Sequence, residues 1–161
     1  SLILFSVILG SLYINKITTR KKIHYHAGFA VVANDKKFNF SEWKYMNIKP
    51  CELGEGARQP QEDEQLEKAH LHDLVGDVMH VEHEGALWKD LFINIHYPVD
   101  QTKVTAFING EKVPDYEQKV INKNDRLVLF IGTNDIKKGL LQAPSKSYIE
   151  LIGKQSKTCG E

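Results

Sequence analysis

The sequence predicts an α+β fold, in which one helix packs across a mixed β-sheet in a β-grasp-like arrangement. Segments rich in β-branched and aromatic residues lie on both sides of one stretch with helical periodicity. Two of these segments end in the turn signals Asn-Asp and Asn-Gly, which are typical of hairpins. A mixed sheet with a covering helix satisfies this order of elements, and a β-sandwich is the alternative.

The first half of the chain is expected to form a hairpin, an irregular insertion and a further strand. The segment IHYHAGFAVVAND over 23–35, followed by KKFNF, predicts the hairpin. Residues 41–69 are polar and irregular, and a short helix is expected only at QEDEQLEKA. The segment DVMHVE then predicts a short strand.

The second half begins with the packed helix, because apolar residues recur at helical spacing in GALWKDLFINI. We expect its residues Leu87, Leu91 and Phe92 to be buried against the sheet. Their partners there would be Val31, Phe107 and Leu129. The segment KVTAFINGEKVP predicts a second hairpin, and RLVLFIG predicts a buried strand.

Two short C-terminal helices are expected at NDIKKGLLQ and SKSYIELIGKQS. Ser145 is a suitable N-cap for the second, since a serine hydroxyl can accept a hydrogen bond from the first turn. Tyr148, Ile149 and Ile152 would form its buried side.

The N-terminal segment SLILFSVILGSLYI has no charge and is mostly apolar. It is shorter than the roughly 20 residues that span a bilayer, so we expect residues 1–15 to be part of a transmembrane helix. A signal peptide and a buried core helix are the alternatives. The basic run over 16–22 would be a juxtamembrane linker, and 23–161 would form one histidine-rich domain.

Two features of the sequence give opposite indications of the side of the membrane on which the domain lies. The basic linker alone would favour the cytoplasm, whereas a disulfide between Cys51 and Cys159 would suit an oxidising compartment. Two free thiols are equally compatible with their spacing. We favour a soluble domain outside the cytoplasm. The formal net charge of zero gives no reason to expect nucleic acid as a partner.

Six of the seven histidines fall in two short segments, HYH and HLHDLVGDVMHVEH. Residues i and i+2 of a strand point to the same face, so His24 and His26 would project together, as would His70 and His72. Neutral imidazole is a common ligand of zinc, copper, iron and nickel. These pairs therefore predict a transition-metal site, and a patch of structural or pH-sensing histidines is the alternative.

Gly76 permits a tight return of the chain that would bring His80 opposite the second pair. His83 would join the site if the chain turns near Gly85. Metal-bound histidines commonly donate their other N–H to a carboxylate. The nearby carboxylates expected in that supporting role are Asp73, Asp77 and Glu82.

The segments IHYHAGFAVVANDKKFNFSEWKYM, HLHDLVGDVMHVEHEGALWKDLF, FINGEKV and RLVLFIG resemble a family of uncharacterised, single-helix-anchored proteins from uncultured bacteria and archaea. The resemblance covers about residues 20–160. Its members read HxH in the last histidine pair, whereas here Glu82 stands at the second position and His83 is displaced by one. The histidines that match the pattern are His26, His70, His72 and His80.

The resemblance implies an architecture and a histidine motif, but no reaction. A cysteine before HLHD and a late one in the tail YIELIGKQSKTCGE are also typical of the family. The resemblance therefore implies a Cys51–Cys159 bridge.

Together these features predict a membrane-tethered domain that binds copper or zinc for capture, delivery or stabilisation of the fold. A metal-dependent hydrolase is one alternative, with Glu82 or Asp73 as general base. An accessory structural subunit of a larger membrane complex is another. The chain has no HExxH, P-loop or GxSxG motif, so no established enzyme class is indicated and no catalytic residue is predicted.

Overall fold

The computed structural model describes residues 23–47 and 64–155. The expected anchor over 1–15, the linker over 16–22 and both cysteines lie outside these residues. Within the described ranges, no helix is both long enough and apolar enough to cross a membrane.

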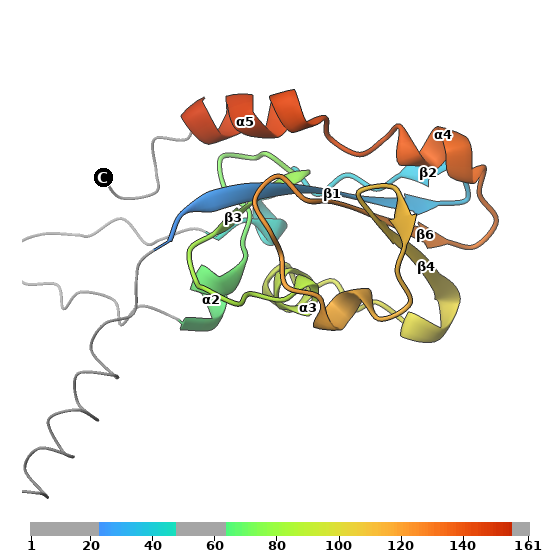
Figure 1. Cartoon of the computed structure of the whole chain (residues 1–161), viewed down its shortest axis with the longest axis horizontal. Coiled ribbons are helices and arrows are strands. Elements are labelled where there is room, and N and C mark those ends of the chain that lie inside the picture. The colour runs from blue at the N-terminus through green and yellow to red at the C-terminus, as the bar shows by residue number, and fades with distance from the viewer. Residues whose placement is uncertain (1–22, 48–63, 156–161) are drawn as a thin grey trace, which may run out of the picture.

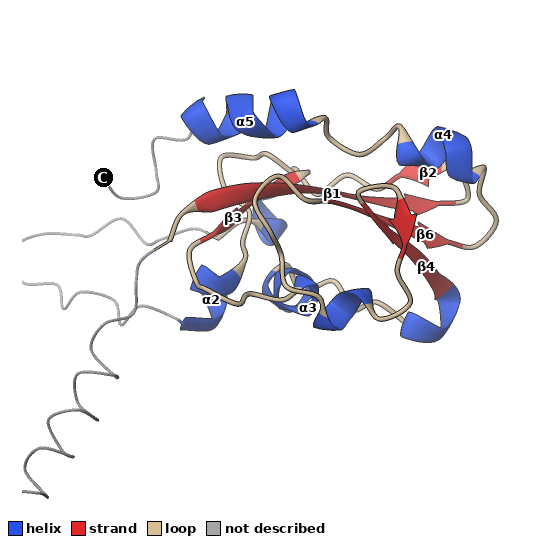
Figure 2. Ribbon diagram, viewed as in Figure 1, coloured by secondary structure: helices blue, strands red, loops and turns tan. Residues whose placement is uncertain are grey.

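The described strands form one six-stranded mixed sheet with helices on both faces (Figures 1 and 2). The strand order is β2-β1-β6-β4-β5, and β3 pairs with the other end of β1 on the β2 side. β1 is parallel to β6 and antiparallel to β2 and β3. The strands are β1 (Tyr25–Ala33), β2 (Lys36–Lys37), β3 (Val78–Val81), β4 (Val104–Ile108), β5 (Glu111–Lys112) and β6 (Arg126–Ile131).

This arrangement confirms the expected mixed sheet with a packed helix. The described strands belong to one sheet, so the β-sandwich alternative is wrong for this part of the chain. The helices are α2 (Glu64–Lys68), α3 (Trp88–Asn94), α4 (Ile136–Leu140) and α5 (Lys146–Gln155). Short 3-10 turns lie at Trp43–Tyr45, Gln101–Lys103 and Tyr116–Gln118.

Both expected hairpin turns form, because their residues accept left-handed backbone angles. Asn34 and Asp35 have φ of 48° and 66° between β1 and β2, and Asn109 and Gly110 have φ of 54° and 89° between β4 and β5. Two consecutive residues with positive φ are characteristic of the tight turns that match the twist of a hairpin.

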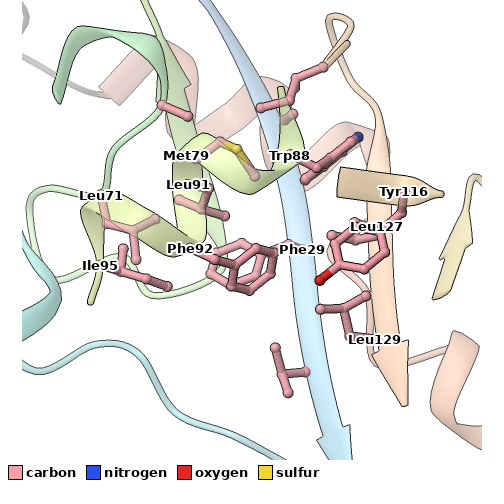
Figure 3. Packing of buried hydrophobic residues seen from close by; sticks show 14 of the residues in the cluster. Phe29, Leu71, Met79, Trp88, Leu91, Phe92, Ile95, Tyr116, Leu127 and Leu129 are labelled. Carbon is pink, nitrogen blue, oxygen red and sulfur yellow. The ribbon is translucent and has the colours of Figure 1, made fainter. Parts of the chain in front are cut away.

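The main core lies between the sheet and α3. Phe29, Leu91 and Leu129 are fully buried there, and Trp88 and Met79 close the same cluster (Figure 3). Phe29 and Phe92 meet edge to face with their ring centroids 6.1 Å apart. Burial of large apolar side chains of this kind, each worth roughly 1.5–3 kcal/mol, holds α3 against the sheet.

A second, smaller apolar cluster lies on the opposite face, under α4. It contains Ala30, Val32, Val128 and Phe130. Phe107 joins this cluster, with its ring centroid 5.7 Å from that of Phe130. The expectation that Phe107 packs against α3 is therefore wrong, because the register of β4 turns its side chain to the other face.

α5 lies across β1 on the same face as α4 (Figure 1). Ser145 caps it as expected, since its Oγ accepts a hydrogen bond from the Tyr148 backbone N–H at 3.2 Å. Ile149 is fully buried, whereas the Tyr148 side chain is exposed, contrary to expectation. Gly28 allows α5 to lie close to β1, because a Cβ at this position would be only 2.8 Å from Ile149 Cδ1.

The C-terminal end of α3 carries a left-handed residue that is not glycine. His96 has φ of 52°, and the His96 and Tyr97 N–H groups donate to the Ile93 and Phe92 carbonyls, as in a Schellman motif. A left-handed conformation costs a residue with a Cβ about 1–2 kcal/mol, of which the greater flexibility of unfolded glycine offsets part. We therefore expect His96→Gly to raise the free energy of unfolding by about 0.5–1 kcal/mol.

Chemical denaturation of the two proteins would measure this change. His96→Ala is the matched control, because it removes the same imidazole but keeps the Cβ. An equal gain in stability from His96→Ala would contradict the backbone explanation.

Candidate metal centre

The alternation of β1 places its histidines on the face opposite the main core. Ala27 and Phe29 belong to the core under α3, so His26 and Gly28 point to the α5 face. His24, two residues before His26, lies on that same face, with the two ring centroids 4.8 Å apart. The sequence thus alternates core residues with imidazoles.

The same alternation continues on the neighbouring segments. Met79 is a core residue of β3, and His80 points the other way, directly across from His26 in the strand pairing. On the far side of β3, His80 pairs with His70 through a short antiparallel bridge. Three imidazoles therefore stand in a row across three adjacent segments, and His72 follows two residues after His70.

His80 is the centre of this group. His24 Nε2 lies 3.1 Å from His80 Nδ1, and His26 Nε2 lies 3.2 Å from His80 Nε2. The ligand atoms of these three residues all lie within 4.8 Å of one another. His80 is 1% exposed, whereas His24 is exposed and His26 is half-buried. The group therefore runs from the interior to the surface.

His70 and His72 complete what we call the histidine cluster. Their ring centroids lie 5.7 Å and 3.5 Å from that of His80, and 5.8 Å from each other. The cluster consists of His24, His26, His70, His72 and His80.

Acceptor groups orient two of these rings. His70 Nδ1 lies 2.9 Å from the Leu66 carbonyl oxygen, and His72 Nδ1 lies 2.7 Å from Asp73 Oδ2. A carbonyl or carboxylate can only accept, so each Nδ1 carries the proton, and the lone pair of the neutral ring is on Nε2. Metal-binding histidines are commonly fixed in this way.

The surroundings favour the neutral form of the inner rings. Burial lowers the pKa of His26 to about 4, and the neighbouring His24 and His72 add to the effect. Burial, followed by repulsion from His72 and His26, lowers the pKa of His80 further. Because metal ions bind the unprotonated ring, these two imidazoles are ready to ligate at neutral pH.

A cleft of about 370 Å³ opens beside the exposed side of the cluster. His24 and His26 line it together with residues of α5 and the Lys123–Asn124 turn. α5 approaches closely because it has no side chain at Gly153, where a Cβ would lie 2.6 Å from His26 Nδ1. The cluster is therefore partly covered by α5 but still open to small solutes.

Of the other residues that the sequence predicted for the site, only Asp73 contacts a ring of the cluster among the described contacts. His83 is placed against α2, with Nδ1 2.9 Å from the Glu84 carbonyl oxygen and Nε2 3.5 Å from Glu64 Oε1. Asp77 forms an ion pair with Lys37 at 2.8 Å. Among the described contacts, neither residue nor Glu82 reaches a ring of the cluster, whereas Asp73 does.

Two elements of the site were not predicted. The Leu66 carbonyl that orients His70 comes from the middle of α2, and Gly153 comes from α5. A backbone carbonyl leaves no sequence signal of its own. Gly153 is a glycine within a helical pattern, which is the one available hint of close approach.

Comparison of the chain with known proteins adds no relative: no family model matches it, and neither a curated protein nor a solved structure is significantly similar. Fold and site define the class as an α+β domain in which three histidines, His24, His26 and His80, lie close enough together to hold a metal ion.

Proposed function

We propose that this protein binds copper or zinc in the histidine cluster and acts in metal capture, delivery or stabilisation of its own fold. The observation that carries the proposal is the convergence of the His24, His26 and His80 ligand atoms within 4.8 Å. Three imidazoles from separate positions form a donor set that does not depend on one flexible side chain.

The choice of metal follows from the donor atoms. Imidazole suits copper, zinc, iron and nickel, and the affinity of nitrogen sites for divalent ions peaks at copper. The rings of His26 and His80 are kept neutral by burial, which suits a cation that must compete with protons. Copper and zinc are therefore the proposed ions.

The setting of this domain is part of the same proposal. The apolar segment over 1–15 would tether it to a membrane, with the soluble domain outside the cytoplasm and a bridge between Cys51 and Cys159. The histidine motif and this tether are the reasons to group the chain with the single-helix-anchored family named above. The order β2-β1-β6-β4-β5 with α3 across one face supports assignment to the β-grasp folds.

A metal titration of the full chain tests the proposal. The protein would be purified in detergent, stripped with a chelator and dialysed against Cu(II) or Zn(II), and bound metal and Tm would be measured. We expect retained metal and a higher Tm, with about 2.7 kcal/mol of stabilisation at a free metal concentration 100-fold above Kd. Metal that is lost on dialysis, together with an unchanged Tm, would overturn the proposal.

The cleft beside His24 and His26 favours a second candidate, a metal-dependent hydrolase. A metal held by three histidines can activate water if one coordination position stays open. Turnover of an activated ester by the zinc-loaded chain, lost in His24→Gln, would support this role. Bound zinc without such turnover would contradict hydrolysis of activated esters and would leave metal binding as the proposed function.

A further inference from the structure

The cleft beside the histidine cluster has charged walls. Its volume is about 370 Å³, and besides His24 and His26 it is lined by two lysines and one glutamate. Lys123 lies in the turn before β6, whereas Glu150 and Lys154 belong to α5. Both lysines are exposed to solvent. The proposed metal site therefore opens into a space in which positive side chains outnumber negative ones.

Neither lysine has a carboxylate partner among the residues that the structure describes. The lysine ion pairs of this part of the chain lie elsewhere, at Lys37, Lys44, Lys68, Lys103 and Lys138. The acid that lines the cleft, Glu150, instead accepts a hydrogen bond from the Asn124 side chain at 3.2 Å. The ammonium groups of Lys123 and Lys154 are therefore available to an anion that enters the cleft.

The positive charge beside the cluster acts against a metal ion bound there. Burial and then the neighbouring imidazoles lower the pKa of His26, and the Lys123 ammonium adds to this effect. The charge of Lys123 therefore acts at the His26 ring. An ammonium that disfavours a protonated imidazole also disfavours a divalent cation bound to the same ring. Three neutral imidazoles bring no negative charge that would offset this repulsion, whereas an anion in the cleft would offset it.

The donor set leaves a coordination position for such an anion. A zinc ion held by three protein ligands typically takes water or a substrate as its fourth ligand. Among the described residues, the group whose ligand atoms are close enough to share an ion consists of three histidines and contains no carboxylate. Two of them, His24 and His26, line the cleft from which a ligand would arrive.

We propose that the cleft receives a small oxyanion, a carboxylate or a phosphate, as a further ligand of the bound metal ion. One oxygen would bind the ion, and the others would lie near the ammonium groups of Lys123 and Lys154, which attract such groups as point charges. The cleft volume of about 370 Å³ falls in the range of small-molecule pockets, roughly 300–1,000 Å³. This inference rests on the proposed metal binding and adds to it the class of ligand that shares the site.

Titration of the copper-loaded chain with two anions tests this inference. The full chain in detergent would be loaded with copper(II), and sodium acetate or inorganic phosphate would be added at constant pH and ionic strength. The visible absorption of copper(II) reports a change in its ligands, and equilibrium dialysis would show that the copper stays bound. We expect a saturable shift of the absorption band, and the anion with the lower Kd identifies the preferred class. Calorimetry should show weaker binding of the same anion to the metal-free chain.

Lysine variants test the role of the cleft. Lys123→Gln and Lys154→Gln each remove one positive charge but keep the metal ligands, so each should raise the Kd of the anion about two- to fivefold. In buffer without a coordinating anion, the same variants should bind copper at least as tightly as the unaltered chain, because a repulsive charge is gone. Lys146→Gln is the matched control, since it removes the same charge from the other end of α5, and it should change neither affinity.

The possible results differ for the two proposals. A chain that retains no copper would overturn metal binding and the oxyanion site together. Retained copper whose absorption neither anion shifts would overturn the oxyanion site and leave metal binding intact. An anion Kd that is the same in Lys123→Gln, Lys154→Gln and the unaltered chain would also overturn the assignment of the anion to this cleft.

Discussion

Replacing His80 with glutamine is expected to cause the largest loss of metal affinity of any single substitution in this chain. His80 contacts both histidines of the β1 side and lies against the His70–His72 pair. Substitutions that only disturb residues behind a metal ligand typically cost about 10–100-fold in affinity. Loss of the central ligand should exceed this range, and a competition titration with a chelator of known affinity would measure it.

Because His80 is 1% exposed, its replacement could also disturb the fold. His24→Gln provides an independent measure, since His24 is exposed and lies outside the apolar core. It should weaken binding while the metal-free Tm stays unchanged. His83→Gln should keep the affinity of the unaltered chain. Equal affinities for all three variants would rule out the cluster as the binding site.

Acid is expected to destabilise the metal-free protein. Burial holds the pKa of His26 at about 4 in the folded state, against 6.5 in an ordinary environment, and the pKa of His80 is lowered further. Below pH 6.5 the unfolded chain therefore binds more protons than the folded chain. The free energy of unfolding therefore decreases as the pH drops from 6.5 towards 4. Above pH 6.5 these two groups make no further contribution to its pH dependence.

Each affected group can contribute at most about 1.4 kcal/mol per pH unit in this window, and less for His26, which is partly exposed to solvent. Chemical denaturation with a chelator present, at a series of pH values between 7 and 5, would measure the slope. His26→Gln should reduce it. A stability that is unchanged or higher at pH 5 would contradict the assignment of neutral, buried imidazoles.

Local signals in the sequence were sufficient for most individual elements. Asn34–Asp35 and Asn109–Gly110 predicted both hairpins, because few residues accept consecutive positive φ angles. The helical spacing in 87–95 predicted α3. The parallel pairing of β1 with β6 has no comparable signal, since it joins residues about a hundred positions apart and depends on the whole sheet.

The sequence did not correctly predict which side some apolar residues face, because both faces of the sheet are covered by apolar clusters. Phe107 and the α3-facing residues are equally hydrophobic, so only the register of β4 decides where Phe107 points. In α5, the small contact area over Gly28 buries Ile149 but leaves Tyr148 exposed. Both outcomes depend on tertiary packing.

The two-residue period of β-strands predicted the histidine cluster, and the end of a strand explains why His83 lies outside it. His24, His26, His70, His72 and His80 all alternate with core residues, so they share one face. His83 is three positions after His80 and follows the end of β3, which takes it to α2. A two-residue period carries no information once the strand has ended.

The position of α5 over His26 has a kinetic consequence. Gly153 lies against the ring, and the helix forms one wall of the cleft through which solutes reach the cluster. Among the described residues of α5, Ile149 is the buried one, and elements held by few buried side chains detach from a domain at a lower free energy than global unfolding requires. Detachment of α5 would widen this cleft and so speed the entry and exit of an ion, while equilibrium affinity would be set by the imidazoles beneath the helix.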